Sequence, residues 1–407
     1  MNMLKRVVVT GMGTVTSIGI GVSVFWDNLI KGKSGISPIE SFDTSIYNRH
    51  LGGEIKEFNA ESFISRRVIR KIGRAAQFGV AAAQMAIREA RLDISSINSS
   101  KIGVVMGTSA GEGANSRQIN NMWINSGVMG IPKDLISQTP SFMIPAGIAM
   151  EFGFKGPNFM IPTACASGNY AISRAVGLIK TGMVDAAIAG GTDAFAQGVF
   201  LAFLRAGTLA SEKVQPFDLN RSGLIPGEGA GVLLIESLEH ASQRGANIIC
   251  EIVGYGFGCD AYHMVSPHPK GKGLKIAIES ALKMSGLSTN QINYINAHGT
   301  GTPTNDLAET NAIKLVFGES AKDIPISSIK SMLGHCQGAC GGIEAVTCCL
   351  AIKHGIIPPT INLEEPDPNC DLDYVPNKAR KVPLETVMSN ALGFGGNNCC
   401  IIFQNFD

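Results

Sequence analysis

The sequence predicts an α/β fold built around a buried sheet, and three observations support this. Short apolar runs typical of strands alternate along the chain with longer stretches typical of helices. Of the 407 residues, 45% are hydrophobic and only 16% are charged, which fits a compact body and argues against intrinsic disorder. The 48 glycines indicate many tight turns and close backbone approaches. A chain of this length holds about two to three domains, or one large body made of two halves.

The elements can be placed by their residue ranges. Strands are expected at Arg6–Thr10, Ile102–Met106, Phe159–Ile161, Ala186–Ala189, Gly231–Glu236, Ile248–Tyr255, Tyr294–Ala297, Ile324–Ser327 and Cys399–Phe403. Helices are expected at Ser65–Ala90, Asn169–Lys180, Leu274–Met284, Asp306–Val316 and Gly342–Lys353. Because no proline- or serine-rich linker divides the chain, two halves would share an interface.

The N-terminal stretch has a basic pair followed by apolar residues, which also occurs in secretion signals. Thr, Ser and Gly interrupt this apolar run, so a strand that enters a glycine-rich turn is the favoured interpretation. No window reaches the roughly 18 uninterrupted apolar residues that a membrane span needs. We therefore expect a soluble, cytoplasmic protein with no membrane contact.

Charge and cysteine usage exclude several function classes. The formal net charge of +1 provides no overall field for nucleic acid, so an acidic partner would have to meet a local basic patch. The ten cysteines show no paired CxxC spacing, which argues against structural zinc. Most of them lie in apolar strings, where cysteine packs as a small hydrophobic residue, so free thiols in a reducing compartment are expected.

One cysteine stands in a different context. The segment Pro162–Tyr170 has an apolar strand before it, small residues around Cys165, and a helix that begins at or just after the cysteine. A helix N-terminus offers free N–H groups and a positive dipole end, which would lower the pKa of this thiol. Backbone N–H groups beside it could also form an oxyanion hole. A buried structural cysteine is the alternative.

Two histidines and a lysine follow later strands in the same manner. His298 comes at the end of an apolar strand, before a Gly/Thr loop that cannot be helical ahead of Pro303. Lys330 and His335 follow the strand Ile324–Ser327, just before a glycine-rich helix start. Sheets of this class bind ligands at the carboxyl ends of their strands. Each residue alone could be a core histidine or a surface lysine, but the pattern repeats three times.

A cysteine with two histidines suits decarboxylative carbon–carbon bond formation on a thioester. The thiol would accept an acyl group, and two N–H donors would stabilise the enolate left when carbon dioxide departs from a malonyl thioester.

A weak internal repeat also suggests two related halves: Ala164–Gly168 opens a helix that ends near Gly182, and Ala339–Gly342 opens another that ends near Gly355.

At these residues the chain resembles the β-ketoacyl-acyl-carrier-protein synthases of the thiolase superfamily, of the synthase II type. The resemblance runs from Lys5–Gly11 to Gly393–Asn397 and includes TACASG, HGTGTPTND, KSMLGH and GFGGNN in this order. It implies two βαβαβαββ halves in a five-layer αβαβα body, with residues 1–250 carrying the nucleophile and residues 251–407 the histidines. It further implies an acyl carrier protein as partner, acyl and malonyl thioesters as substrates, and no cofactor apart from the carrier's own 4′-phosphopantetheine.

The resemblance also assigns roles residue by residue. It implies that Cys165 is acylated, that His298 and His335 assist decarboxylation, and that Lys330 lies beside them. Further implied assignments are Asp306 and Glu309 as acidic neighbours of Lys330, Phe394 as a gate whose amide completes the oxyanion hole with that of Cys165, Thr300 and Thr302 as pantetheine contacts, and Phe203 and Gly395 as substrate contacts. Ala110 would form the floor of an acyl tunnel where family members often carry isoleucine, which would leave room for longer chains. A monovalent cation is implied more weakly at Asn296, Glu344, Ser389 and Asn390, with no other metal.

The chain departs from the family pattern at a few positions. Threonine is usual where Asn397 or Asn398 stands, and small residues are usual at Cys336 and Cys340, which we interpret as packing substitutions.

A basic cluster offers a docking surface for an acidic carrier protein. Arg67, Arg70 and Lys71 would share one helix face at spacings i, i+3 and i+4, and Arg205 would add to the patch. Such clusters are more often plain solvated surface. The resemblance also implies a homodimer, with a heterodimer containing a chain-length subunit as an alternative.

Several functions remain open at this point. The same chemistry serves fatty acid elongation and dissociated polyketide or polyene assembly. A non-catalytic chain-length subunit is disfavoured because Cys165, His298 and His335 are all present. A thiolase is disfavoured because that relative uses a Cys–His–Cys set.

Overall fold

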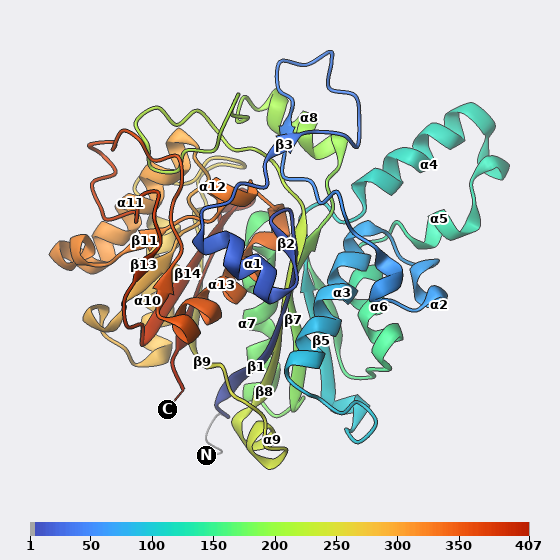
Figure 1. The fold of residues 1–407 in the computed structure, drawn as a ribbon, viewed down its shortest axis with the longest axis horizontal. Helices are drawn as coiled ribbons and strands as arrows, with labels where there is room; N and C mark the ends of the chain where they lie inside the picture. The colour runs from blue at the N-terminus through green and yellow to red at the C-terminus, as the bar shows by residue number, and fades with distance from the viewer. Residues whose placement is uncertain (1–4, 407) are drawn as a thin grey trace.

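The computed structural model describes residues 5–406, and its centre is a mixed sheet to which both parts of the chain contribute (Figure 1). The strands before residue 250 are β1 (Val7–Thr16), β5 (Ile102–Gly107), β6 (Asn158–Ile161), β7 (Ala186–Asp193) and β8 (Gly229–Ser237). The later strands are β9 (Cys250–Cys259), β10 (Tyr294–Asn296), β11 (Ile326–Ser327), β14 (Thr386–Gly393) and β15 (Asn397–Gln404). The minor strands are β2 (Gly19–Ile20), β3 (Ser37–Pro38), β4 (Leu51–Gly52), β12 (Ile356–Ile357) and β13 (Arg380–Lys381).

The two sets of strands have the same topology. The sheet order is β6-β5-β7-β8-β1 in the first set and β11-β10-β14-β15-β9 in the second, so each set reads third, second, fourth, fifth, first. The second, third and fourth strands of each set are parallel, and the first and fifth pair antiparallel. The two first strands join the sets where Val8 and Val9 pair with Glu251 and Cys250. This repeated topology confirms the duplicated, thiolase-like fold.

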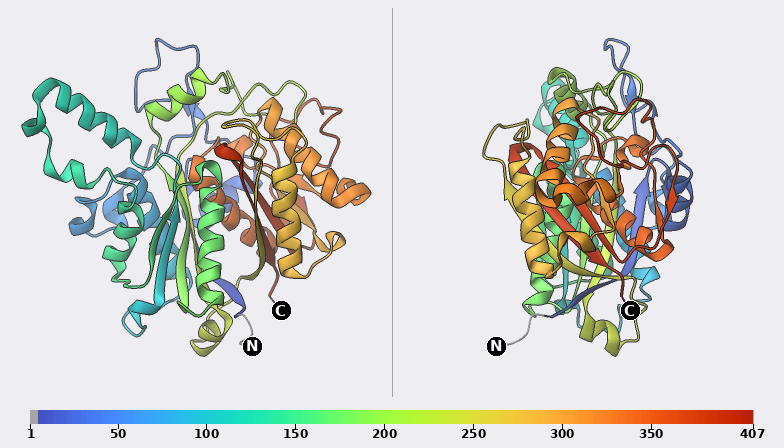
Figure 2. Two further views of the ribbon diagram at one scale, coloured as in Figure 1. Left: turned by 180° about the vertical axis from the view of Figure 1, so that it is seen from behind. Right: turned by 90° about the vertical axis from the view of Figure 1, so that its left-hand side faces the viewer.

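Helices cover the sheet on both sides and also run through the middle (Figures 1 and 2). They are α1 (Val22–Ile30), α2 (Arg66–Ile69), α3 (Arg74–Glu89), α4 (Gly113–Ser126), α5 (Lys133–Ser137), α6 (Met143–Phe152), α7 (Ser167–Lys180), α8 (Gln197–Arg205), α9 (Leu238–Gln243), α10 (Lys272–Ser285), α11 (Pro303–Phe317), α12 (Lys330–Leu333) and α13 (Cys340–His354). The central helices α7 and α13 each contact strands of both sets, whereas α3 packs on the first set and α10 on the second. The two strand sets are the two β layers, α7 and α13 lie between them, and α3 and α10 belong to the outer layers, which gives the five-layer αβαβα order.

Glycines allow the two central helices to meet at their N-terminal ends. A Cβ atom on Gly168 of α7 would lie 2.6 Å from the backbone nitrogen of Gly342 in α13. A Cβ atom on Gly342 would lie 2.1 Å from the carbonyl oxygen of Gly231 in β8 and 2.6 Å from the nitrogen of Gly191 in β7. No side chain fits between these backbones, so glycine is required by the close approach itself.

A strained turn precedes each central helix. Ala164 has a φ of 50° and begins a short 3₁₀ turn before α7, and Gln337 has a φ of 56° and begins the same turn before α13. In this register Cys165 corresponds to Gly338, and Cys340 corresponds to the first residue of α7. The alignment of Ala164-Cys165 with Ala339-Cys340 expected from the sequence is therefore wrong by two residues. The two segments share a backbone geometry and not the position of their cysteines.

Two other expectations fail for local reasons. The helix expected over Ser65–Ala90 is two helices, because the carboxylate of Glu112 accepts hydrogen bonds from the nitrogens of Ala75 (3.3 Å) and Ala76 (2.9 Å) and starts α3 anew. β14 was not expected, because Ser389 and Asn390, although buried, interrupt the run of apolar residues by which a strand is recognised. Helices α1, α4, α5, α6, α8, α9 and α12 were also missed.

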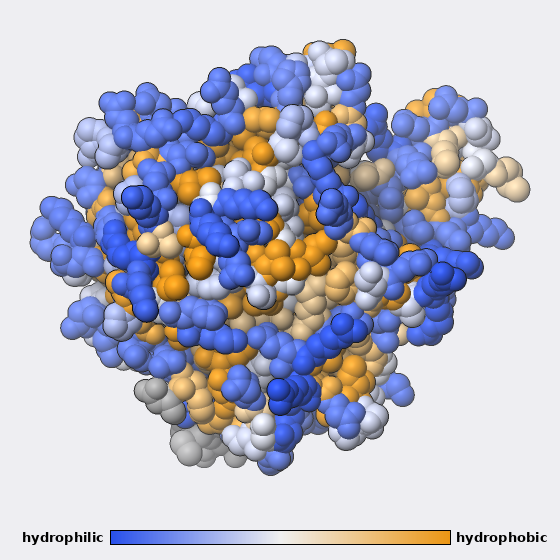
Figure 3. All heavy atoms as spheres, viewed as in Figure 1, coloured by the Kyte–Doolittle hydropathy of each residue, from blue (hydrophilic) through white to orange (hydrophobic). Residues whose placement is uncertain are grey.

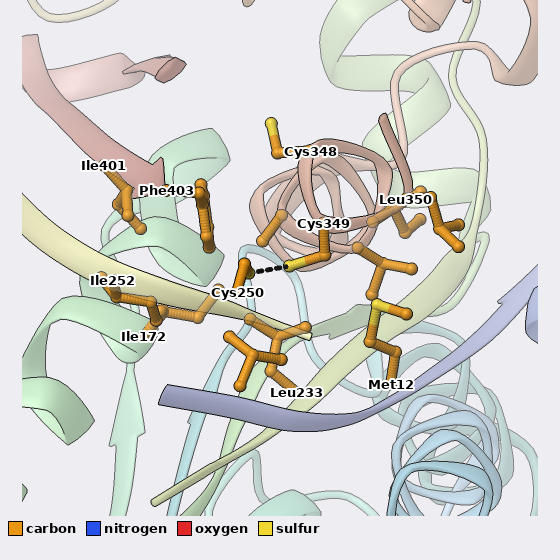
Figure 4. Close-up of a cluster of buried hydrophobic side chains, with 14 of the residues drawn as sticks. Met12, Ile172, Leu233, Cys250, Ile252, Cys348, Cys349, Leu350, Ile401 and Phe403 are labelled. Carbon is orange, nitrogen blue, oxygen red and sulfur yellow. Dashed lines mark hydrogen bonds between the residues drawn. The ribbon is translucent and has the colours of Figure 1, made fainter. Parts of the chain in front are cut away.

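The core at the junction of the two strand sets is apolar and rich in sulfur (Figure 4). The Sγ atoms of Cys250 in β9 and Cys349 in α13 lie 3.4 Å apart among Met12, Leu233 and Phe403. All ten cysteines are free thiols, and only Cys259 is exposed. Across residues 5–406, no helix combines the length and the apolar character needed to cross a membrane.

The glycine contact between the central helices yields a stability prediction. Gly342→Ala should destabilise the protein by about 3 kcal/mol, because the new methyl group would overlap the Gly231 backbone. Gly198→Ala in α8 is the matched control, since a Cβ atom there meets nothing within 4 Å. Thermal unfolding should show a lower Tm for the first variant only; equal Tm values would contradict the requirement for glycine at residue 342.

Candidate active site

A cavity of about 360 Å³ opens where four segments meet, and both halves of the fold line it. Its reactive lining residues are Cys165, His298 and His335. Thr300, Thr302, Phe203 and Phe394 also line it. Cys165 follows β6, His298 follows β10, His335 follows α12, and Phe394 follows β14. The structure thus brings together residues that lie up to 229 positions apart in the chain.

Cys165 occupies the 3₁₀ turn before α7 and is buried. Burial raises the pKa of its thiol to about 12, although Lys330 nearby and the backbone N–H groups of Phe394 and Cys165 act to lower it. The expected fall in pKa at the helix N-terminus is therefore wrong, because desolvation of the sulfur outweighs the charges and dipoles around it. The resting group is a thiol with two N–H donors aimed at it.

The loop that carries Phe394 is held from two sides. The nitrogen of Gly395 donates to the carbonyl oxygen of Met264 at 2.7 Å, and Asn397 Nδ2 donates to the carbonyl oxygen of Phe394 at 2.9 Å. The Phe394 ring is 37% exposed and meets Phe203 edge-on at 6.1 Å between centroids. Since its N–H lies beside Cys165 and its ring faces the cavity, this residue can both donate to an oxyanion and respond to a bound acyl group.

Glu309 fixes the backbone that presents His298. Its carboxylate accepts hydrogen bonds from the nitrogens of His298 (2.9 Å) and Gly299 (2.8 Å). Burial raises the pKa of Glu309 to about 7 against these bonds. The His298 ring is buried, and its Nδ1 atom has no hydrogen-bond partner within residues 5–406. Burial, followed by the positive charge of Lys330, holds the pKa of His298 well below its usual value.

His335 lies opposite His298, with ring centroids 5.4 Å apart and nearly perpendicular planes. Its main chain is tied to the loop before β8, because its nitrogen donates to Ile225 O at 2.7 Å and Gly227 N donates to its carbonyl oxygen at 2.9 Å. Burial and then the charge of Lys330 lower the pKa of His335 to about 3. Both imidazoles are therefore neutral near pH 7 and can donate one N–H each.

Lys330 does not lie in a loop as expected but opens α12, where it is buried. Its Nζ atom forms an ion pair with Glu344 of α13. Burial acts to lower the pKa of Lys330, but the carboxylate of Glu344 raises it above the usual value, so the ammonium group stays charged. This buried positive charge adds to the effect of burial in disfavouring protonation of the two histidines.

The expected acidic neighbours of Lys330 have other partners. Glu309 binds the His298 loop and adds only a weaker field at Lys330. Asp306 accepts from the nitrogens of Phe217 (2.8 Å) and Gly301 (3.2 Å), and its Oδ2 lies 3.9 Å from Arg221 Nε. The assignment of Asp306 as a partner of Lys330 is thus corrected. The reason is that the N-terminal turn of α11 directs this carboxylate at the loop that carries Thr300 and Thr302.

Asp193, at the end of β7, is a site residue that sequence reasoning missed. Its carboxylate accepts from Thr108 Oγ1 (2.7 Å) and from the nitrogens of Ser109 (2.8 Å), Ala110 (2.9 Å) and Gly338 (2.7 Å). Burial raises its pKa to about 6 despite these bonds. The available signal was an acid placed directly after an apolar strand, as for the histidines. Ala110 is half-buried in this loop and is not among the residues that line the cavity, so its role as a tunnel floor stays a prediction.

Several oxygens suited to a cation are buried near Lys330 without full hydrogen bonding. Asn296 Oδ1 and Glu344 Oε2 have no partner among the described residues, and Ser389 Oγ has only the Cys348 thiol beside it. Asn296 and Ser389 are direct neighbours on β10 and β14. Asn390 Nδ2 lies 3.4 Å from Glu309 Oε1, and Asn390 Oδ1 also has no partner among the described residues. A monovalent cation at these four side chains stays a prediction. Within residues 5–406, no group of three or more His, Cys, Asp and Glu side chains is arranged for another metal ion.

The basic residues expected to dock a carrier protein are exposed but lie in two places (Figure 1). Arg67 belongs to α2, whereas Arg70 and Lys71 follow the end of that helix, so the three do not share one continuous helix face. Arg67 also donates to the carbonyl oxygen of Met150 at 3.0 Å. Arg205 ends α8, directly before Ala206 and Gly207 at the mouth of the cavity.

Comparisons with known proteins agree with this geometry. Residues 4–241 match the model of the β-ketoacyl synthase N-terminal domain, and residues 249–364 match that of the C-terminal domain. The chain is similar to 3-oxoacyl-[acyl-carrier-protein] synthase 2 of Synechocystis sp., with 43% identity over 99% of this chain and 98% of the relative. The protein of the same name from Staphylococcus aureus is 41% identical over the full length of both chains.

Solved structures give the same result. The ishigamide ketosynthase/chain length factor superposes with a TM-score of 0.96 at 38% identity, covering 99% of this chain and 100% of that chain. A type II polyketide ketosynthase in complex with its acyl-carrier protein gives a TM-score of 0.91 at 35% identity, with the same coverage. Both family models, these full-length likenesses and the Cys–His–His cavity lead to one conclusion: the chain belongs to the β-ketoacyl synthase family.

Proposed function

We propose that this protein catalyses the decarboxylative condensation of an acyl group with malonyl-acyl-carrier protein, giving β-ketoacyl-acyl-carrier protein and carbon dioxide in fatty acid elongation. The observation that carries this proposal is one cavity lined by a thiol with two N–H donors and by two neutral histidines. The relatives named 3-oxoacyl-[acyl-carrier-protein] synthase 2 support the same reaction.

In the first half-reaction, Cys165 takes the acyl group from a carrier thioester. Its sulfur attacks the carbonyl carbon and gives up its proton, and the carrier sulfur that leaves takes up that proton to depart as a thiol. The N–H groups of Phe394 and Cys165 stabilise the oxyanion of the tetrahedral intermediate. Because the resting thiol has a high pKa, the sulfur loses its proton during the attack and not before it.

In the second half-reaction, the histidines act on the malonyl thioester. Its carboxylate leaves as carbon dioxide, and the bonding electrons form an enolate whose oxygen accepts N–H bonds from His298 and His335. The enolate carbon then attacks the acyl-Cys165 carbonyl and forms the new carbon–carbon bond. The carbon–sulfur bond breaks, the cysteine leaves as a thiolate, and it takes up one proton from water to return to the resting thiol. Neutral histidines suit this role because each donates a proton in a hydrogen bond without giving it up.

This chemistry needs no resident cofactor, since the 4′-phosphopantetheine arm arrives on the carrier protein along Thr300 and Thr302. A bound monovalent cation would be held by Asn296, Glu344, Ser389 and Asn390, whose buried oxygens lack full hydrogen bonding. We place the reaction in the cytoplasm, in keeping with the free thiols.

Polyketide or polyene assembly is the second candidate function. It is favoured by the likeness to the ishigamide and type II polyketide ketosynthase structures at 38% and 35% identity. Product analysis with saturated and polyunsaturated acyl carriers distinguishes the two pathways, since the chemistry at Cys165 is the same in both.

We further propose that a second copy of this chain covers the projecting arm formed by α4, α5 and the loop between them. The arm exposes Trp123 (58%), Ile124 (75%) and Met129 (96%), and Figure 3 displays hydrophobic atoms on it. β6 ends the sheet and exposes Phe159. An open strand edge beside apolar side chains favours pairing with another ketosynthase-fold subunit, either a second copy or a chain-length subunit.

The catalytic assignments predict separate losses in the two half-reactions. Cys165→Ala should form no acyl-enzyme, whereas His298→Ala and His335→Ala should acylate normally and release carbon dioxide from malonyl carrier about 10²-fold more slowly. Intact-protein mass spectrometry and carbon dioxide release measure the two steps. Cys336→Ala, at a buried thiol beside the site, should retain both. An acyl adduct on Cys165→Ala would contradict the nucleophile assignment.

The docking proposal predicts a KM effect for carrier substrates alone. Reversing the charges of Arg67, Arg70 and Lys71, or that of Arg205, should raise the KM for acyl carriers about 10-fold and weaken its dependence on salt. The kcat for a small acyl thioester should not change. Lys283→Glu on the surface of α10 is the matched control. An unchanged KM for acyl carriers would show that the tested residues do not contribute to carrier docking.

The interface proposal predicts a change of mass in solution. The wild-type chain should sediment as a dimer, and Trp123→Glu with Met129→Glu should sediment as a monomer, because two charges would be buried at an apolar contact. Ile276→Glu on α10 serves as the control and should remain dimeric. A wild-type monomer would instead favour a different subunit as the partner.

A further inference from the structure

Cys340, the first residue of α13, lies against the imidazole of His335. Its Sγ atom is 3.2 Å from His335 Nδ1, and the backbone nitrogen of Gln337 is 3.0 Å from the same atom. All three residues are buried, so water does not compete for this contact. His298 differs, since its Nδ1 atom has no partner among the described residues.

These contacts determine which nitrogen of His335 carries the proton. A backbone N–H can only donate, so Gln337 requires Nδ1 to be the unprotonated acceptor of the ring. The hydrogen of the neutral imidazole is then on Nε2. With Nδ1 unprotonated, the Cys340 group must be the donor, through its S–H. Burial raises the pKa of Cys340 well above its usual value, so this hydrogen is present.

We propose that Cys340 is a positioning residue that donates its S–H to His335 Nδ1 and so strengthens Nε2–H as a donor to the substrate enolate. This inference rests on the proposed function of His335. A second donor at Nδ1 withdraws electron density from the ring, which makes Nε2–H more acidic, and the low dielectric of the site increases the effect. It also restrains rotation of the ring. His335 is thereby the stronger of the two enolate donors.

The register of the two helix starts explains how this contact arises. Cys340 occupies in α13 the place that Ser167 occupies in α7. Ser167 Oγ contacts Ala164 O (2.6 Å) in its own turn and Thr108 O (3.0 Å) directly after β5. In the second turn the side chain at this place reaches the histidine instead. The thiol is thus more than the packing substitution expected from the sequence.

Two substitutions of Cys340 test the proposal in the full-length protein. Cys340→Ala should lower kcat for carbon dioxide release from malonyl carrier about 10-fold, with KM and the rate of Cys165 acylation unchanged. Cys340→Ser should restore most of the rate, because a hydroxyl can donate to Nδ1. Cys336→Ala removes a neighbouring buried thiol whose Sγ lies 4.0 Å from the carbonyl oxygens of Leu333 and Gly334, and it should behave as wild type.

A measurement on the ring itself separates this proposal from the proposed function. In protein labelled with ¹⁵N-histidine, the unprotonated Nδ1 signal of His335 should move toward that of a freer acceptor in Cys340→Ala and return in Cys340→Ser. The inference is overturned if this signal does not move, or if acylation and carbon dioxide release fall by one factor that serine does not restore. Absence of carbon dioxide release in the wild type would refute the proposed function, while the ¹⁵N signals would still decide the role of Cys340.

Discussion

The contact between the N-terminal ends of α7 and α13 is the constraint on which the site depends. Gly168 and Gly342 remove every side chain from this crossing, so two backbones from different halves of the fold touch directly. Cys165 lies just before one helix and His335 just before the other. A larger residue at the crossing would separate the nucleophile from its histidine before any catalytic group was altered. The geometry of the reaction is therefore set by backbone packing.

Burial then gives each catalytic group its protonation state. The thiol keeps its proton and both imidazoles stay neutral, because burial removes the water that would stabilise a charged thiolate or imidazolium. The ion pair of Lys330 with Glu344 places one fixed positive charge behind them. The site is thus poised to stabilise negative charge that appears during the reaction, while it holds little charge on its reacting atoms at rest.

The sequence allowed the fold class and the reacting residues to be predicted, because an apolar strand precedes the segment that carries each of them. The ion pairs and hydrogen bonds of the buried acidic side chains were harder to predict. Glu344 rather than Asp306 pairs with Lys330, since that pairing depends on how α13 crosses the sheet. Asp193 was missed because its partners are mainly backbone nitrogens of distant loops. The direction of the pKa shift expected for Cys165 was wrong, because the burial of a turn residue depends on tertiary packing and cannot be read from a local motif.

The strained turn before each central helix occurs twice in the fold, yet only one copy carries a reactive side chain. Where the first turn has Cys165, the second has Gly338, whose nitrogen donates to Asp193 of the other half. The second turn therefore presents a backbone nitrogen where the first presents a thiol, and that nitrogen joins the second half of the fold to the first. The same backbone geometry thus does two jobs: one turn offers a side chain to the cavity, and the other holds the two halves in register around it.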